Sequence, residues 1–268
     1  MQRLALGVEY DGSAFAGWQM QRGQRTVAEE LGRAVARVAD RPLDLVCGGR
    51  TDAGVHAEGQ VVHFDAPVLR SVRGWRLGIN SDLPKDISVR WVCPVPQWFH
   101  ARYSALGRVY RYRILNRDTR GALQARYVTW VRRPLDLAAM QAAADRLVGE
   151  HDFSAFRAAG CQSRSPVRRL DQIALGRDGE QVWIDVAANA FLHHMVRNLA
   201  GLLIEIGHGD AAPDWATEVL ESRDRRRGAM TAPPEGLYLR CIRYPAAFRL
   251  PGAGDVEQAC RSAMIAPH

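Results

Sequence analysis

One carboxylate, with an arginine two residues before it, stands in a short glycine-rich segment, residues 48–56 (GGRTDAGVH). Glycine gives such a segment backbone freedom, including positive φ and a close approach of a ligand to the main chain. In extended backbone, residues two apart point to the same side, so we expect Arg50 and Asp52 to share a face and the carboxylate to be ionised. Local chemistry leaves two interpretations open: a reactive, ligand-facing loop, or an Asx-type turn closed by a salt bridge.

Composition narrows the class of protein that carries this loop. A length of 268 residues predicts one large domain or two modest ones. No leader-like segment and no apolar run of membrane-spanning length is present, so we expect a protein without a membrane partner. The cysteines are odd in number and lack Cys-x-x-Cys spacing, which is typical of a reducing cytoplasm and argues against structural zinc. They are Cys47, Cys93, Cys161, Cys241 and Cys260.

The charge of the chain points to an anionic partner. The formal net charge is +7 and the pI is about 9.5, and nucleic acid is the commonest large anion that proteins bind. Lys85 is the only lysine, so the number of arginines can also reflect coding bias. Placement is more informative, because arginines interleaved with aromatic residues can bind phosphates while stacking on bases.

Two stretches combine arginine with aromatic or polar residues, 100–113 and 162–169. In the first, strand alternation places Tyr110 and Tyr112 on one face and Arg111 and Arg113 on the other. A half-buried strand with solvated arginines explains the first stretch equally well, and a solvated surface loop explains the second.

Alternating strands and helices must position these residues. Strands are predicted over 4–10, 43–47, 60–64 and 87–92, and a helix over 69–79. Thr26 and Glu29 form a capping box before another helix, whose apolar positions are Val27, Leu31, Val35 and Val38. This order is βαββαβ.

A second unit of the same kind follows. Strands are predicted over 108–115, 171–175, 181–187 and 236–243, with a hairpin at 177–180 and helices after Asp136 and over 192–206. We therefore predict an α+β fold in which two ferredoxin-like or RRM-like βαββαβ subdomains join into one mixed, largely antiparallel sheet. Helices would cover one face and leave a basic cleft on the other. The predicted division is 1–105, 106–248 and a tail without regular structure, 249–268.

Six segments considered together resemble the tRNA pseudouridine synthase A family. They occur in order and at matching spacing over roughly residues 4 to 245, which makes the resemblance more specific than one short motif. The segments are 9–12 (EYDG), 49–56 (GRTDAGVH), 99–102 (FHAR), 110–112 (YRY), 152–156 (DFSAF) and 189–198 (NAFLHHMVRN).

The resemblance implies a pseudouridine synthase fold, a tRNA partner and an isomerase. Members convert uridines at positions 38, 39 and 40 of the tRNA anticodon stem-loop to pseudouridine, as homodimers and without cofactor or metal. Breaking the glycosidic N1–C1′ bond and rejoining the base through C5 requires neither redox chemistry nor a hydrolytic water, but does require a carboxylate.

The resemblance also assigns roles to residues. Asp52 is the nucleophile, attacking C1′ or C6 or assisting departure of the base through a glycal route, and Arg50 flips the base and partners Asp52. Tyr110 stacks on the uracil and is a candidate acceptor of the C5 proton, and Leu237 lines the base pocket. The predicted RNA-contact residues are Arg70, His100, Arg102, Tyr103, Gln162, Ser163 and Arg164.

Two other functions and one metal site were weighed against this one. A nucleoside or glycoside hydrolase would pair Asp52 with Asp11 or Glu58, although capping or turn duties explain those two carboxylates more simply. A catalytically silent RNA-binding module would need no reactive loop. We predict no metal site at His193 and His194, because adjacent histidines on a helix point about 100° apart and no His-Glu-x-x-His spacing is present.

Overall fold

A computed structural model describes residues 1–251, which form two compact units. Unit 1 consists of Met1–Leu106 with the described residues from Tyr238 onward, and unit 2 of Gly107–Leu237. Most of the predicted tail 249–268 lies outside the described residues. Among the described helices, none has the length and apolar character needed to cross a membrane.

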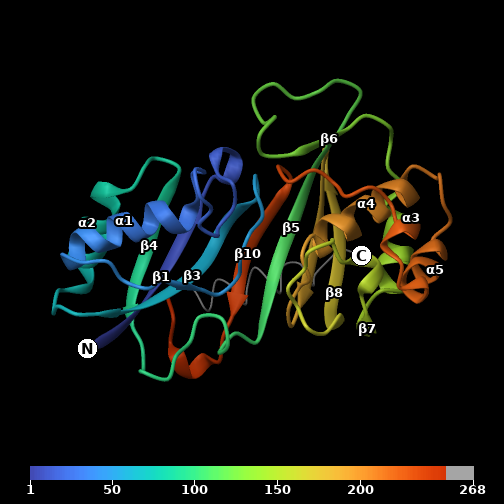
Figure 1. Ribbon diagram of the computed structural model, residues 1–268. Helices are drawn as coiled ribbons and strands as arrows, with labels where there is room; N and C mark the ends of the chain where they lie inside the picture. Colours follow the sequence, from blue (N-terminus) through green and yellow to red (C-terminus); the bar gives the residue numbers. More distant parts are fainter. Residues whose placement is uncertain (252–268) are drawn as a thin grey trace. The chain divides into compact units, whose positions relative to one another are not determined.

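Unit 1 has the predicted βαββαβ order (Figure 1). Its elements are β1 (Gln2–Tyr10), α1 (Val27–Ala39), β2 (Val46–Cys47), β3 (His56–Ala66), α2 (Val72–Asp82) and β4 (Ile87–Pro94). Strand β1 pairs antiparallel with β3 and β4, and β2 pairs antiparallel with β3. The spatial order β4–β1–β3–β2 is the ferredoxin-like one. Strand β10 (Leu237–Arg243) adds a parallel neighbour at the start of β3.

Helix α1 buries three of the four apolar positions that the sequence predicts, and the fourth, Val38, is half-buried. Val27, Leu31 and Val35 of α1 are fully buried, and α1 lies beside α2 in the helical layer (Figure 1). The predicted capping box is wrong, because Thr26 is the N-cap residue but its hydroxyl makes no capping hydrogen bond. Glu29 of that box lies 3.7 Å from Arg33 one turn later, in an ordinary i,i+4 ion pair.

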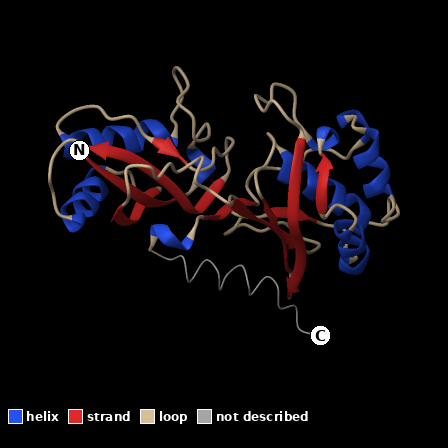
Figure 2. Cartoon of the chain, turned by 90° about the horizontal axis from the view of Figure 1, so that it is seen from below, coloured by secondary structure: helices blue, strands red, loops and turns tan. Residues whose placement is uncertain are grey.

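Unit 2 contains a second sheet segment with helices beside it. Its order is β5–β9–β8–β7 with antiparallel pairs, and β6 pairs parallel with β5. Figure 2 shows the helices of this unit gathered on one side of its strands. The strands are β5 (Gly107–Asn116), β6 (Thr129–Val131), β7 (Gly149–Asp152), β8 (Val167–Asp178) and β9 (Gln181–Ala188). The helices are α3 (Leu137–Asp145), α4 (Met195–Gly207) and α5 (Trp215–Ser222).

The predicted α+β class and largely antiparallel pairing are confirmed in both units. The short elements β6, β7 and α5 were not predicted, because three or four residues carry too little periodicity for a strand and α5 is only two turns long. Strand β10 was assigned to the second subdomain, 106–248. In the structure its residues from Tyr238 on are grouped with unit 1, and Tyr238 and Leu239 pair in parallel with His56 and Ala57 of β3.

Four single 3₁₀ turns complete the described chain. The first, η1, follows β1 directly and begins the loop described below. The turns are η1 (Gly12–Ala14), η2 (Ser154–Phe156), η3 (Arg225–Arg227) and η4 (Ala246–Phe248).

Candidate active site

The glycine-rich loop 48–55 connects β2 to β3 in unit 1. At its start, the N–H of Gly48 donates to the carbonyl of Val61 at 2.8 Å, which continues the pairing of the two strands. Near its end, the N–H of Val55 donates to the carbonyl of Asp52 at 3.2 Å and closes a tight turn. The loop is therefore an ordered extension of the sheet, and Asp52 is part of its turn.

A second loop, 11–18, lies directly against the backbone of loop 48–55. The N–H of Trp18 donates to the carbonyl of Thr51 at 3.0 Å. Gly17 has a φ of +94°, and a Cβ added there would lie 2.8 Å from the Thr51 carbonyl oxygen. Only glycine meets both demands, a left-handed backbone and contact between two main chains. This contact supports the peptide that precedes Asp52.

His56 fixes the other end of the loop 11–18. Its ring is 2% exposed and stacks on Tyr238, with centroids 4.6 Å apart. The N–H of Gly12 donates to Nδ1 at 3.0 Å, so this nitrogen carries a lone pair and the nearby Asp11 carboxylate, at 3.2 Å, accepts no proton from it. Asp11 instead accepts from the N–H and hydroxyl of Ser13 and caps η1. The capping interpretation of Asp11 is confirmed.

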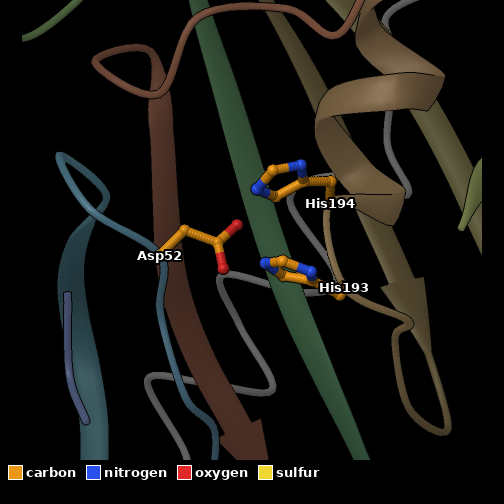
Figure 3. A group of neighbouring side chains, drawn as sticks. All are labelled: Asp52, His193 and His194. Carbon is orange, nitrogen blue, oxygen red and sulfur yellow. The ribbon is translucent and has the colours of Figure 1, made fainter. Parts of the chain in front are cut away.

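Arg50 and Asp52 both lie within reach of a ligand. The side chain of Arg50 is exposed, Asp52 is half-buried, and Figure 3 shows the Asp52 carboxylate projecting from its loop. The predicted ion pair between them stays a prediction. Cys47, at the start of the loop, does not compete as a nucleophile, because burial raises the pKa of its thiol to about 11 even though Arg50 opposes the shift.

Two buried side chains anchor the loop on either side of Arg50. The Tyr10 hydroxyl lies 2.7 Å from the Thr51 hydroxyl, and both residues are buried. The Gln60 side chain is fully buried, accepts from the N–H of Gly49 at 3.2 Å and donates to the Gly49 carbonyl. Neither Tyr10 nor Gln60 was assigned a role from the sequence.

Strand β5 of unit 2 presents the predicted alternation of tyrosine and arginine. Tyr110 lies opposite Val186 and Tyr112 opposite Ile184, so both tyrosines share a buried face, which confirms that part of the prediction. Tyr110 is 8% exposed and meets Phe191 edge to face, with centroids 5.1 Å apart. Burial raises the pKa of Tyr112, so its phenol is a hydrogen-bonding group and no base.

Arg111 and Arg113 face the side of β5 opposite to the two tyrosines. Arg111 binds the buried Asp185 carboxylate through two hydrogen bonds of 2.7 and 2.6 Å and lies over the Trp183 ring. This arginine is therefore engaged in the sheet itself. Leu237, predicted in the base pocket, begins β10 and is 5% exposed.

The predicted RNA-contact residues of unit 1 are accessible. Arg70 is exposed just before the N-cap of α2. His100 accepts the N–H groups of Arg102 and Tyr103, while the Arg102 guanidinium lies 5.6 Å from the exposed Tyr103 ring. Burial, with a contribution from Arg3, lowers the pKa of His100 and favours this neutral, accepting form.

The predicted contact residues of unit 2 occupy the segment before β8. Gln162 and Arg164 are exposed, and Ser163 lies between them. Arg157 donates to the carbonyl of Ser163 at 2.8 Å and Arg168 to its hydroxyl at 2.5 Å. Two arginines thus shape the segment in which Gln162 and Arg164 are exposed.

His193 and His194 differ from the sequence expectation. They precede α4, which begins at Met195, and His194 has a φ of +61° outside the helical region. Their rings lie 4.1 Å apart (Figure 3), so the expectation that they point about 100° apart on a helix is wrong. The helical geometry assumed for these two residues does not apply, because the helix begins after them.

Comparison with known proteins assigns the family. The family model for tRNA pseudouridine synthase matches residues 7–104 and 143–245. The chain belongs to the tRNA pseudouridine synthase family. It is 55% identical to tRNA pseudouridine synthase A of Methylococcus capsulatus, over 92% of both chains. It is 53% identical to tRNA pseudouridine synthase A of Coxiella burnetii, over 94% of this chain and 96% of the relative.

One solved structure shows only a weak similarity to the chain. A Cbf5-Nop10-Gar1 complex matches at a TM-score of 0.35 and 12% identity, covering 75% of this chain and 45% of that one. A similarity of this size carries no functional conclusion.

Membership of the synthase family makes the chain an isomerase, since pseudouridine has the same atoms as uridine. It favours this activity over a hydrolase and over a silent RNA-binding module. The second carboxylates that a hydrolase would use have structural partners: Asp11 caps η1, and Glu58 pairs with Arg240 at 3.1 Å.

Gln60 and Tyr10, which hold the loop, were not predicted from the sequence. Gln60 leaves one signal, because it is a polar residue directly before the buried, apolar Val61 and Val62 of β3. Tyr10 leaves none, since a tyrosine at the end of a strand is an ordinary core residue. In this synthase the missed residues are those that position the loop.

Proposed function

We propose that the chain converts uridines 38, 39 and 40 of the tRNA anticodon stem-loop to pseudouridine, with Asp52 as its nucleophile. The observation that carries the proposal is Asp52 on an ordered, glycine-framed loop in a member of this family. The resemblance of the sequence to the tRNA pseudouridine synthase A family supports uridines 38, 39 and 40 as the targets. On the same basis we propose a homodimer that acts in the cytoplasm, where its tRNA substrate is found.

The reaction exchanges one bond of C1′ for another. The N1–C1′ bond breaks, the C5–C1′ bond forms, C5 loses its proton and N1 gains one, so no atom is added or removed. Asp52 serves this exchange by attacking C1′, by adding to C6 or by assisting departure of the base as a glycal forms. All three routes need the carboxylate held close to the flipped nucleotide.

Three further residues have proposed roles in the reaction. Arg50, exposed beside Asp52, would fill the space that the target base leaves, because extrusion of a base costs a few kcal/mol. Tyr110 would stack on the extruded uracil and take part in removing the C5 proton, and Leu237 would line the apolar side of the pocket.

Affinity for tRNA would come from the exposed basic and aromatic residues. Contacts with phosphate and shape, without reading of sequence, allow one surface to bind many tRNAs. The proposed contact residues are Arg70, His100, Arg102, Tyr103, Gln162, Ser163 and Arg164.

Release of tritium tests the reaction class. The protein is incubated with tRNA labelled with tritium at uridine C5, and both the water and the free bases are analysed. We expect label in water without free uracil, because C5 exchanges its proton for a bond to C1′. Free uracil would indicate a hydrolase, and neither product would indicate a binding module; both would overturn the proposal.

A further inference from the structure

Arg50 lies between two residues that the core holds in place. On one side, Gln60 bonds to both polar backbone groups of Gly49. On the other, Tyr10 bonds to the Thr51 side chain at 2.7 Å. Both peptides that flank Arg50 are thereby fixed, although the Arg50 side chain itself is exposed.

The bond to Thr51 also sets the direction of the two reactive side chains. Successive side chains of an extended segment point to opposite faces. Because Thr51 is 7% exposed and turned toward Tyr10, its neighbours Arg50 and Asp52 turn outward. An apolar pair of the same shape would fill the same space but would lack the directional bond between the two side chains.

An irregularity in the sheet brings the two anchors to the loop. In the pairing of β1 with β3, Val8 lies opposite Gln60 but Tyr10 lies opposite Ala57, so two residues of β1 span three of β3. Such bulges re-aim side chains and are frequent next to active sites. Tyr10 and Gln60 therefore stand on either side of one bulge, each aimed at loop 48–55.

We propose that Tyr10 and Gln60 are positioning residues of the isomerisation, which hold Gly49 and Thr51 so that Arg50 and Asp52 face the target nucleotide. Neither side chain contacts the substrate in this account. The inference rests on the proposed roles of Asp52 and Arg50. Displacement of a reacting group by about 1 Å can cost up to about 100-fold in rate, so anchors of this kind control the rate of the reaction.

The chain offers a matched pair of variants for the test. Thr51→Val removes the hydroxyl that bonds to Tyr10, and Thr129→Val removes a hydroxyl that lies 2.6 Å from the Tyr112 hydroxyl in unit 2. Both threonines are buried and bond to a buried tyrosine. The measurements are the single-turnover rate of pseudouridine formation at saturating enzyme, the Kd for tRNA and the Tm.

We expect Thr51→Val to lower the single-turnover rate between about 10- and 100-fold with an unchanged Kd. Thr129→Val should leave the rate unchanged, while both variants lower the Tm by a similar amount, about 2–4 °C. Thr51→Ser, which keeps the hydroxyl, should restore most of the rate. Tyr10→Phe should reproduce the effect of Thr51→Val, and the double variant should be no slower than either single one.

Wild-type rates in both Thr51→Val and Tyr10→Phe would overturn the positioning role. Equal loss of rate in Thr51→Val and Thr129→Val would also overturn it, since the effect would then follow stability alone. Asp52→Ala is measured in the same assay: a rate near wild type there would refute the proposed nucleophile instead. The two failures are therefore distinguishable.

Discussion

Buried polar side chains serve different purposes in the two units. In unit 1, three buried residues of β3 each bond to the backbone of a different loop: His56 to Gly12, Gln60 to Gly49 and His63 to Ala101. These loops carry or flank the residues with predicted roles in chemistry and RNA contact.

In unit 2, buried polar side chains join parts of the scaffold. Asn116 donates to the carbonyls of Val131, the last residue of β6, and of Arg133 just after it. Asn198 donates to the carbonyl of Phe156 in η2. The Tyr112 and Thr129 hydroxyls link β5 to β6. These bonds connect one framework element to the next.

The difference shows two uses of the same interaction. Most buried amides and hydroxyls are hydrogen-bonded, since leaving one unpaired costs about 1–3 kcal/mol. In unit 2 that requirement fixes the packing of strands and helices. In unit 1 it fixes loops, so loss of a polar group there should affect the rate of reaction more than it affects stability.

The largest expected effect is that of Asp52→Ala. We expect turnover to fall at least about 1000-fold, because the variant lacks the carboxylate that all routes require. The Kd for tRNA should remain unchanged, since affinity comes mainly from arginine contacts with phosphate. Filter binding and pseudouridine formation are measured on the same samples, with the exposed Asp44→Ala as control. A parallel loss of binding would contradict the separation of chemistry from affinity.

Arg50→Ala should have the next largest effect. Base extrusion costs a few kcal/mol, so loss of the residue that supports it should slow turnover on intact tRNA about 100-fold. On a tRNA whose target uridine is mismatched, and therefore less firmly stacked, the variant should lose less of its turnover. Arg41→Ala, at another exposed arginine, is the control. Equal losses on paired and mismatched substrates would argue against base flipping.

Gly17→Ala tests the contact between the two loops of unit 1. Its Cβ would lie 2.8 Å from the Thr51 carbonyl, so we expect the loop to shift and turnover to fall about 10-fold. Gly23→Ala is the matched control, because Gly23 also has a positive φ but an added Cβ meets nothing within 4 Å. Similar rates for both variants would mean that the contact does not position Asp52.

The smallest expected effect concerns stability at acid pH. Burial, with Arg3 nearby, lowers the pKa of His63 to about 4 from an ordinary 6.5. The folded state then binds fewer protons than the unfolded one, so this contribution to stability is present above pH 6.5 and is lost as the pH falls toward 4. At pH 5 the loss is about 2 kcal/mol.

Urea unfolding at pH 7.5 and pH 5 measures this effect. The wild type should lose more stability between the two values than His63→Gln, by about 2 kcal/mol. An identical pH dependence in the variant would show that His63 titrates normally in the folded state.

The sequence predicts the framework of this molecule and the identity of the loop well. Hydrophobic periodicity located the long strands and helices, and glycines around Asp52 marked an unusual loop. Periodicity could not reveal that Tyr10 and Gln60 meet that loop, because the meeting depends on a bulge in the pairing of β1 with β3. Nor could it place Tyr238 in unit 1, since parallel pairing with His56 joins residues that are distant in the chain.

His193 and His194 illustrate a further limit of sequence reasoning. Helical periodicity continues through Leu192, but α4 begins at Met195 and His194 adopts a positive φ. A helix boundary depends on capping and tertiary contacts, which periodicity does not report. The predicted orientation of two adjacent side chains can therefore be wrong even where the helix itself is predicted correctly.

Position-resolved mapping of pseudouridine in tRNA tests the central claim most directly. Unmodified tRNA transcripts with uridine at position 38, 39 or 40 are incubated with the wild type or with Asp52→Ala under conditions where both bind. We predict pseudouridine at these positions with the wild type and none with the variant. Pseudouridine formed by Asp52→Ala, or formed by the wild type only outside the anticodon stem-loop, would contradict the account.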